Sequence, residues 1–202
     1  MRVLVIGATG TIGRAVSDAL SPRHDVVRVG HSTGDLRVDV TDTASIERLF
    51  RDVGRVDAVV SAAGEMHVGR LTEMSDDAAK LGVLNKLLGQ INVARLALPA
   101  LNDGGSITLS SGLASRTHRP GWSVLSAVNA GLEAFGRTAA LELPRGIRIN
   151  VVSPGGVLET MQAWGMQGPD LSLGTPAAEV AQAYVRSVEG TATGTITDAG
   201  RI

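Results

Sequence analysis

The sequence predicts an α/β fold in which a doubly wound parallel sheet carries helices on both faces. Short β-branched runs alternate with longer amphipathic stretches along the chain, which is typical of βα units around such a sheet. The first apolar run leads directly into a glycine-rich turn, and turns rich in Pro and Gly separate the later segments. The 202 residues are 44% hydrophobic, so residues 1–202 are expected to form one domain around one sheet.

Each element follows from its local pattern, in chain order. Seven short apolar or β-branched runs predict strands over 2–6, 25–29, 37–39, 57–60, 106–109, 148–152 and 195–197. Apolar residues at a spacing of three to four predict helices over 11–20, 43–53, 77–101, 122–143 and 176–187. Strands and helices alternate for most of the chain, so most helices are expected to cross between parallel neighbours.

Composition excludes several classes of function. Nineteen Lys and Arg against 20 Asp and Glu leave a net charge of -1, which gives no overall field toward nucleic acid or an anionic membrane. The absence of cysteine excludes disulfides, thiolate nucleophiles and Cys-ligated zinc, and no metal site is expected. No stretch approaches the ~18 apolar residues of a membrane span, and the first residues lack the apolar core of a signal peptide. We therefore expect a cytoplasmic protein with a small-molecule ligand.

The first strand is followed by GATGTIG, residues 7–13, with Gly7, Gly10 and Gly13 at the start of the first helix. Glycines at these positions allow a tight turn and let the backbone approach a pyrophosphate, which the amides of the helix N-terminus then bind. An apolar strand before the motif and an amphipathic helix after it are the context that a dinucleotide site requires. The alternative is a helix cap without a ligand. The motif favours a Rossmann-like dinucleotide-binding sheet.

The end of the second strand bears on the nucleotide's 2′ group. NAD sites usually place an acid there to accept from the ribose hydroxyl, whereas NADP sites offer cations and hydroxyls. Here the sequence reads Gly30, His31, Ser32 and Thr33, and Arg14 lies just past the glycine loop. NADP(H) is therefore the expected cofactor, with NAD(H) as the weaker alternative. The competing interpretation is that His31 belongs to a solvated turn.

Five segments in order resemble the short-chain dehydrogenase/reductase family over nearly the whole chain. They are GATGTIG, Asp39 with Val40, SAAG at 61–64, SS at 110–111 and IRINVVSPGG at 147–156. The resemblance implies the strand order 3-2-1-4-5-6-7 and a hydride-transfer site above the carboxyl ends of the strands. It also implies the cofactor-binding residues, which are Gly7, Thr9, Gly10, Thr11, Ile12, Gly13, His31, Ser32, Asp39, Val40, Ala62, Ala63, Gly64, Pro154 and Gly155.

The chain departs from the family where the proton relay should stand. LSAVNAGLEAF, residues 125–135, puts Leu125 in the place of the family's tyrosine and Asn129 in the place of its lysine. Hydride transfer to a carbonyl leaves an alkoxide, so an acid must lie within hydrogen-bonding reach. The chain's single tyrosine, Tyr184, falls in the C-terminal helix. The usual relay is therefore absent.

Two residues are the candidate catalytic groups. Counting back from LALPAL places Lys86 where the family has its asparagine, so the lysine and asparagine are exchanged. A desolvated lysine can have a lowered pKa and act as an acid, whereas the alternative is a solvated helix lysine. Ser111 keeps the place of the substrate-binding serine, with Ser110 as the alternative. His118 in the following loop is a further candidate donor.

The sequence therefore leaves three functional hypotheses. The first is an atypical NADP(H)-binding oxidoreductase that transfers hydride to or from a small carbonyl or alcohol. The second is a catalytically silent NADP(H)-binding sensor or scaffold, and the third is a module that binds another ligand in the same cleft. The family's helix pairing across a two-fold axis implies a homodimer or homotetramer. The apolar residues expected at that interface are Leu81, Leu84, Leu88, Ile91, Leu132 and Phe135.

Overall fold

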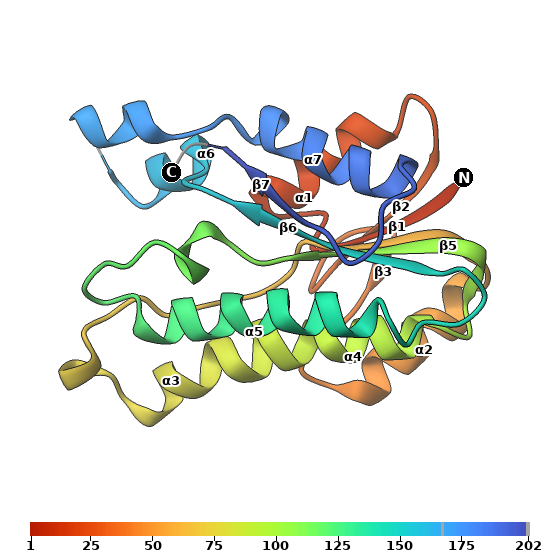
Figure 1. The fold of residues 1–202 in the computed structure, drawn as a ribbon, viewed down its shortest axis with the longest axis horizontal. Coiled ribbons are helices and arrows are strands. Elements are labelled where there is room, and N and C mark those ends of the chain that lie inside the picture. The colour runs from red at the N-terminus through yellow and green to blue at the C-terminus, as the bar shows by residue number, and fades with distance from the viewer. Residues whose placement is uncertain (167, 201–202) are drawn as a thin grey trace.

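The computed structural model describes residues 1–166 and 168–200, and its centre is one seven-stranded parallel sheet (Figure 1). The strand order is β3-β2-β1-β4-β5-β6-β7, as predicted. The chain crosses from β3 to β4 on the far side of β1, which makes the sheet doubly wound. The strands are β1 (Arg2–Ile6), β2 (Asp25–Gly30), β3 (Leu36–Arg37), β4 (Val56–Ser61), β5 (Leu101–Ser110), β6 (Arg148–Pro154) and β7 (Ile196–Ala199).

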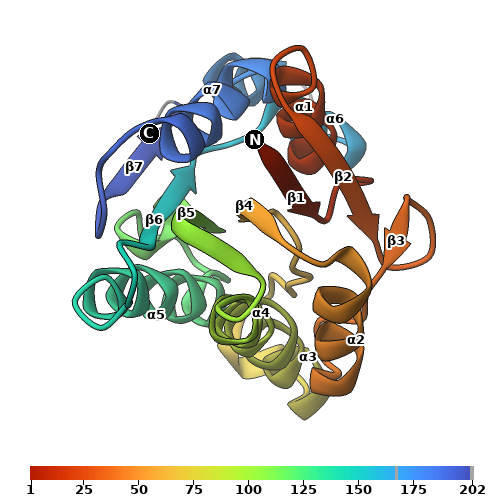
Figure 2. The ribbon, with the colours of Figure 1, turned by 90° about the vertical axis from the view of Figure 1, so that its right-hand side faces the viewer.

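Helices cover both faces of the sheet (Figure 2). Helices α1 (Thr11–Leu20) and α7 (Ala177–Glu189) pack together on one face. The opposite face is covered by α2 (Thr43–Val53), α4 (Gly89–Ala97) and α5 (Ser123–Ala139). The remaining elements are α3 (Asp76–Gly82), a π-helical turn η2 (Val83–Leu88), α6 (Leu158–Ala163) and the 3-10 turns η1 (Leu71–Glu73), η3 (Leu113–Ser115) and η4 (Gly168–Leu173).

The first strand shows why two apolar cores form. Successive side chains of a strand point to opposite faces, so Leu4 and Ile6 join the core beneath α2, α4 and α5. Val3 and Val5 join the second core, beneath α1 and α7. Because both faces are buried, the strand is apolar at every position from Val3 to Ile6 rather than at alternate ones, which is the pattern of a parallel sheet.

The single helix predicted over 77–101 is wrong in two respects. Its middle turn is a π-helix in which the Gly89 amide donates to the carbonyl of Leu84, five residues back. Its end is also earlier, because α4 stops at Ala97, before Pro99. Leu101 then pairs with Val56, so residues assigned to the helix begin β5. A π-helical turn within a helix often marks a functional site.

Smaller corrections concern element ends and the interface residues. Helix α5 ends at Ala139 rather than at 143, and the strand expected over 37–39 is the short β3. Leu132 is fully buried beneath the sheet, so it offers no surface for a partner, whereas Leu81, Leu84 and Leu88 are exposed. The loops after β4 and β5 gather with α3 and α6 at the left-hand end of Figure 1, beyond the carboxyl ends of the strands. No described helix is long and apolar enough to cross a bilayer.

Candidate functional site

The glycine loop is too tightly packed for side chains. A Cβ on Gly13 would lie 2.0 Å from the Gly7 carbonyl oxygen, and Gly7 itself has a φ of +83°, which favours glycine. A Cβ on Gly7 would meet the backbone of Ala62 and Ala63 at 2.7 Å. The loop after β1 and the turn after β4 are therefore in contact, as the predicted cofactor site requires.

Helix α1 begins immediately after this loop and leaves amides available. Its N-cap is Gly10, which has no side chain to cap the first turn. The first amides of a helix have no partner within it, so those of Thr11, Ile12 and Gly13 can bind an anion. The turn thus fits a pyrophosphate by both its open backbone and its dipole.

The residues predicted at the adenine end lie along the edge formed by β2 and β3. His31 and Ser32 are exposed, in a tight turn where a Cβ on Gly30 would lie 2.2 Å from the Thr33 carbonyl oxygen. The Arg14 guanidinium donates to the carbonyl of Thr9 at 3.1 Å, which holds its charge over the glycine loop. This edge therefore presents cationic and hydroxyl groups to solvent.

Asp39 and Val40 follow β3 in the predicted position. One carboxylate oxygen of Asp39 accepts from the amide of Thr41 at 2.9 Å and from its hydroxyl at 2.6 Å. These two hydrogen bonds lower the pKa of Asp39 below its usual value. Val40 packs against the start of α4, where a Cβ on Gly89 would lie 3.1 Å from it.

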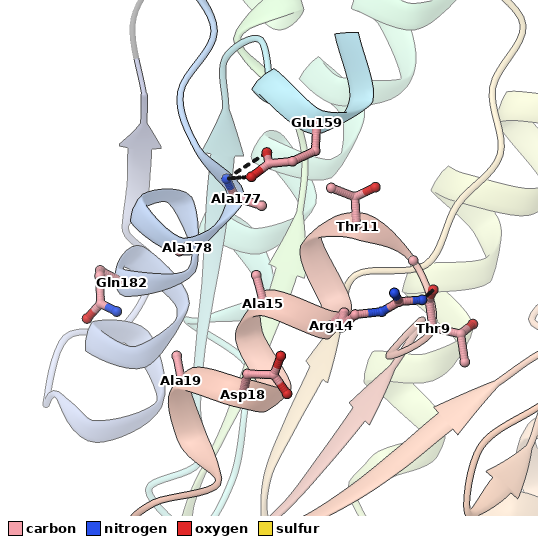
Figure 3. Close-up of a pocket in the computed structure, with 11 residues that line it drawn as sticks. Thr9, Thr11, Arg14, Ala15, Asp18, Ala19, Glu159, Ala177, Ala178 and Gln182 are labelled. Carbon is pink, nitrogen blue, oxygen red and sulfur yellow. Dashed lines mark hydrogen bonds between the residues drawn. The ribbon is translucent and has the colours of Figure 1, made fainter. Parts of the chain in front are cut away.

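A cavity of about 690 Å³ borders the glycine loop on its outer side (Figure 3). Its floor includes Ala15, Ala19 and Ala178, and Arg14 stands at its rim. Glu159 from α6 also lines it, and its carboxylate accepts from the Ala177 amide at 2.9 and 3.1 Å. That contact caps α7, a role that the sequence did not indicate, because the two residues are 18 positions apart.

Lys86 and Ser111 are brought together at the carboxyl ends of the strands. The Lys86 ammonium donates to the Ser111 carbonyl oxygen at 3.0 Å. The lysine is half-buried, and Gly64 lies so close to it that a Cβ there would be 2.7 Å from the Lys86 Cγ. Burial lowers the pKa of Lys86 to about 8. The Lys86 amine thus lies at the carboxyl ends of β4 and β5, beside the backbone of Ser111.

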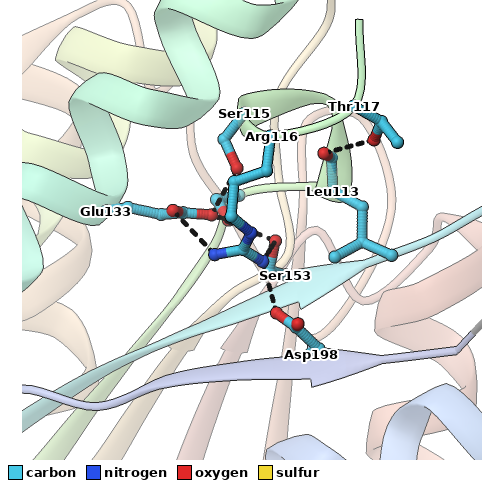
Figure 4. A network of polar contacts seen from close by, with 8 residues as sticks. Leu113, Ser115, Arg116, Thr117, Glu133, Ser153 and Asp198 are labelled. Atoms are coloured by element: carbon cyan, nitrogen blue, oxygen red, sulfur yellow. Dashed lines mark hydrogen bonds and ion pairs between the residues drawn. The ribbon is translucent and has the colours of Figure 1, made fainter. Parts of the chain in front are cut away.

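The Ser111 side chain has a different partner. Only 4% of Ser111 is exposed, and its hydroxyl donates to the carboxylate of Glu133 at 3.0 Å. Figure 4 shows the polar network around Glu133. Glu133 is itself buried, and its other donors are Ser115 at 2.8 Å, Ser153 at 3.1 Å and Arg116 at 3.1 Å. Arg116 also pairs with Asp198 on β7. The Ser111 hydroxyl proton is therefore engaged by Glu133, and the hydroxyl oxygen can still accept a hydrogen bond.

Sequence reasoning missed Glu133, although one signal pointed to it. Glu133 stands one helical turn after Asn129, on the same face of α5. An acid on the buried face of a helix requires partners, and four donors from residues 111–116 and from β6 supply them. These partners are remote in sequence, so the local pattern does not reveal them.

Ser110 and Tyr184 lie on the opposite face of the sheet. The Ser110 hydroxyl donates to the Ser61 carbonyl at 2.6 Å and lies 2.8 Å from the Tyr184 hydroxyl. Tyr184 is fully buried in α7, and this burial raises its pKa. The backbone of Ser110 is held by Gln90, which accepts from its amide and donates to its carbonyl. Neither Ser110 nor Tyr184 shares the Lys86 side of the sheet.

The two departures from the family pattern lie on one face of α5. Leu125 is half-buried, and Asn129 is 1% exposed. The Oδ1 of Asn129 has no hydrogen-bond partner among the described residues. A Cβ on Gly112 would lie 3.0 Å from the Asn129 amide nitrogen and 3.6 Å from the Pro154 carbonyl. Asn129 is thus packed beside Gly112, whereas His118 is exposed in its loop.

The Pro154–Gly155 turn lies next to Gly112, at the carboxyl ends of the strands. Pro154 ends β6, and the Gly155 amide donates to the Ala199 carbonyl at 2.9 Å. The chain then leaves the sheet at Val157 and returns at Thr175, and these two residues form a parallel β-bridge. The excursion between them contains α6, with Met161 buried and Trp164 exposed.

Comparisons with known proteins support the family and the fold. A family model described as enoyl-(acyl carrier protein) reductase matches residues 14–189. A Listeria innocua protein of known structure, lin1944, is 38% identical, with a TM-score of 0.92 and 98% of each chain covered. A small-chain dehydrogenase solved in complex with NADPH is 29% identical, with a TM-score of 0.88, 99% of this chain covered and 96% of that one.

Curated relatives match over shorter segments. An uncharacterised NAD-dependent oxidoreductase of Mycobacterium tuberculosis is 36% identical over 125 residues, which is 58% of this chain and 46% of the relative. A short-chain dehydrogenase/reductase of Pestalotiopsis microspora is 31% identical over 68% of this chain and 54% of the relative. The chain spans about half the length of these curated relatives. The match of the family model over most of the chain, together with the fold, shows that this protein belongs to the short-chain dehydrogenase/reductase family.

Proposed function

We propose that the protein is an atypical oxidoreductase that binds NADP(H) and transfers hydride to or from a small carbonyl or alcohol, in the cytoplasm. The observation that carries this proposal is the contact between Lys86 and Ser111. It places a desolvated amine at the carboxyl ends of β4 and β5, on the side of the sheet where the family pattern has lost its tyrosine. An amine with a pKa of about 8 can hold and release a proton near neutral pH.

The residues around the cleft fit a dinucleotide. The glycine loop and the first amides of α1 would hold the pyrophosphate, and Asp39 with Val40 would lie beside the adenine. Gly64 and the Pro154–Gly155 turn would flank the nicotinamide, which supplies or accepts the hydride when bound. Asn129 offers a buried acceptor oxygen without a partner among the described residues, which is a site for a ligand hydroxyl.

Within this site, Lys86 has the role of proton donor and Ser111 that of acceptor. The Ser111 proton is directed at Glu133, so its oxygen can accept from a substrate hydroxyl but has no free proton to donate. Lys86 carries three N–H donors and uses one on the Ser111 carbonyl, which leaves others for the substrate oxygen.

The cofactor preference rests on the β2 edge. Residues 31–33 contain no carboxylate to accept from a ribose hydroxyl, and the Arg14 cation stands over the adjoining loop. The relative solved with NADPH agrees with this preference. Calorimetric titration with NADP+ and with NAD+ tests it, with Arg14→Gln as the variant and Arg137→Gln on α5 as the matched control. Equal affinities, or tighter binding of NAD+, contradict the preference, and no affinity for either nucleotide supports a module for another ligand.

A silent NADP(H)-binding sensor or scaffold is the second candidate. The observation that favours it is the engagement of Ser111, whose hydroxyl is buried and bound to Glu133. Oxidation of NADPH with a panel of small aldehydes and ketones separates the two functions. Turnover that depends on Lys86 supports the enzyme, whereas tight nucleotide binding without turnover of any compound supports the sensor.

We further propose that the protein forms a homodimer or homotetramer. Leu81, Leu84 and Leu88 are three to four residues apart along α3 and η2, and all three are exposed. Ile91 and Phe135 are half-buried near them in the fold, on α4 and α5. Apolar side chains gathered on one helical face are typical of a surface that a second copy covers.

A further inference from the structure

We propose that Lys86 is a nucleophilic amine that captures aldehydes and ketones as imines at the carboxyl edge of the sheet. This covalent activity goes beyond hydride transfer and requires no nucleotide. It gives the cleft a second way to hold the class of compound that the proposed oxidoreductase would reduce.

Among the described residues, no carboxylate pairs with the Lys86 ammonium. The ammonium donates to a neutral carbonyl oxygen, and it forms no ion pair with a described residue. The carboxylates of the segments packed around it are exposed or already paired, and Asp76 and Asp77 in the first turn of α3 are among the exposed ones. Glu65 is exposed in the loop after β4, and Glu133 on α5 is satisfied by Arg116 and three serines. Desolvation without a partner is what weakens the hold of an amine on its proton.

The local fold also keeps the amine in place. Lys86 stands within the π-helical turn η2, and the backbone of Gly64 packs on its aliphatic stem, where even a Cβ would collide. Because the stem is fixed, the amine is held beside the Ser111 carbonyl rather than free to swing into solvent. An amine fixed in this way meets a carbonyl carbon bound beside it far more often than a mobile one does.

The residue type is the one that this chemistry needs. Of the chain's 19 lysines and arginines, only Lys80 and Lys86 are lysines. Arginine does not lose its proton in proteins, whereas a lysine with a pKa of about 8 is neutral in about one molecule in ten at pH 7. An ordinary solvated lysine is neutral in fewer than about one in a thousand at that pH.

The reaction is a condensation and needs no oxidant or reductant. The neutral Lys86 nitrogen attacks the carbonyl carbon, a carbon–nitrogen double bond forms, and the carbon–oxygen bond breaks. The oxygen leaves as water with the two hydrogens that the amine loses. Hydrolysis reverses the capture, as for other lysine imines.

The two lysines allow a direct test, because Lys80 is an exposed control six residues away. The full chain is incubated with propanal and cyanoborohydride, which reduces the imine to a stable secondary amine. Cleavage at Arg70 and Arg95 gives one peptide that contains both lysines, and tandem mass spectrometry measures the labelled fraction of each. The reactive N-terminal amine falls in a different peptide.

At pH 7 we expect Lys86 to be labelled at least about tenfold faster than Lys80, and its rate to level off above pH 8 while that of Lys80 keeps rising. Lys80→Arg should keep the fast labelling, Lys86→Arg should lose it, and unfolding in urea should equalise the two rates in the wild type. A Lys86 that reacts no faster than Lys80 at pH 7 overturns the proposal. Nucleotide affinity measured on the same sample reports the proposed function separately.

Discussion

The Nζ of Lys86 lies 3.0 Å from the backbone carbonyl oxygen of Ser111, across 25 residues of sequence. This contact joins η2 to the end of β5 and sets the amine at the point where the two predicted catalytic residues meet. A backbone carbonyl cannot be removed by changing a side chain. Substitutions at Lys86 therefore change the amine while leaving its acceptor in place.

Turnover is expected to depend on Lys86 more than nucleotide binding does. Lys86→Met keeps an aliphatic stem and removes the proposed proton donor, so NADPH oxidation should fall at least about 100-fold. Affinity for NADP+, measured by calorimetry, should change less than about threefold. Lys80→Met is the matched control and should retain full activity. NADPH oxidation that survives Lys86→Met removes the lysine from the mechanism.

Stability should respond to pH through the same amine. The pKa of Lys86 is about 8 in the folded chain and near its ordinary 10.5 when unfolded. Between these values the unfolded chain binds more protons, so the free energy of unfolding rises with pH from about 8 to 10.5. In urea unfolding, wild type should gain up to about 3 kcal/mol relative to Lys86→Met between pH 7 and pH 10. A constant difference would mean that the amine titrates normally.

Two glycines of the loop after β1 should differ in how well they tolerate replacement by alanine. A methyl group on Gly13 would lie 2.0 Å from the Gly7 carbonyl oxygen, whereas one on Gly10 would lie at an ordinary contact distance of 3.4 Å. Gly13→Ala should therefore cost at least about 2 kcal/mol of stability and lower the melting temperature clearly. Gly10→Ala should leave thermal unfolding nearly unchanged. Equal melting temperatures for the two variants would contradict the packing of this loop.

Removal of Glu133 should be costly. Glu133→Ala leaves three serine hydroxyls and the Arg116 guanidinium without their shared acceptor, and a loss of about 2 to 4 kcal/mol is expected. Glu142, exposed just beyond the end of α5, provides the control. Denaturant midpoints for both alanine variants give the comparison, and similar midpoints would show that the network contributes little.

The assembly should depend on the exposed leucines. Leu84→Asp places a charge at the centre of the apolar row on α3 and η2, so it should shift the mass measured by light scattering toward that of a monomer. Trp164→Ser also removes an exposed apolar side chain, but from α6, and should leave the mass unchanged. A monomeric wild type at micromolar concentration would refute the assembly itself.

The sheet could be predicted because its strands are buried on both faces and carry continuous apolar runs. The glycine loop could also be predicted, because only glycine fits at Gly7 and Gly13. The helix over 77–101 was misjudged because apolar spacing alone does not show that the hydrogen bonding shifts to a π pattern near Leu84. The start of β5 was missed for a related reason, because the pairing of Leu101 with Val56 is a long-range contact.

For the candidate site, the sequence predicted the positions of residues along the chain but not their contacts. Counting residues placed Lys86 at the cleft, but the carbonyl that binds it and the burial that lowers its pKa follow from tertiary packing. The choice between Ser110 and Ser111 also needed the fold, because their side chains point to opposite faces of the sheet. Glu133 belongs to a network whose other members are remote in sequence, so a linear pattern does not reveal its partners.

The bridge between Val157 and Thr175 bears on which residues can vary without disturbing the sheet. The Thr175 amide donates to the Gly156 carbonyl and the Leu158 amide to the Thr175 carbonyl, so the base of the excursion is fastened independently of its interior. Lengthening a loop whose ends are already fixed costs little, since the entropy of closure grows only slowly with length. Residues between the two anchors can therefore be exchanged or inserted while the sheet and the glycine loop stay as they are. Variation within this span, which includes Glu159, would change the lining of the cavity beside the glycine loop and leave the sheet intact.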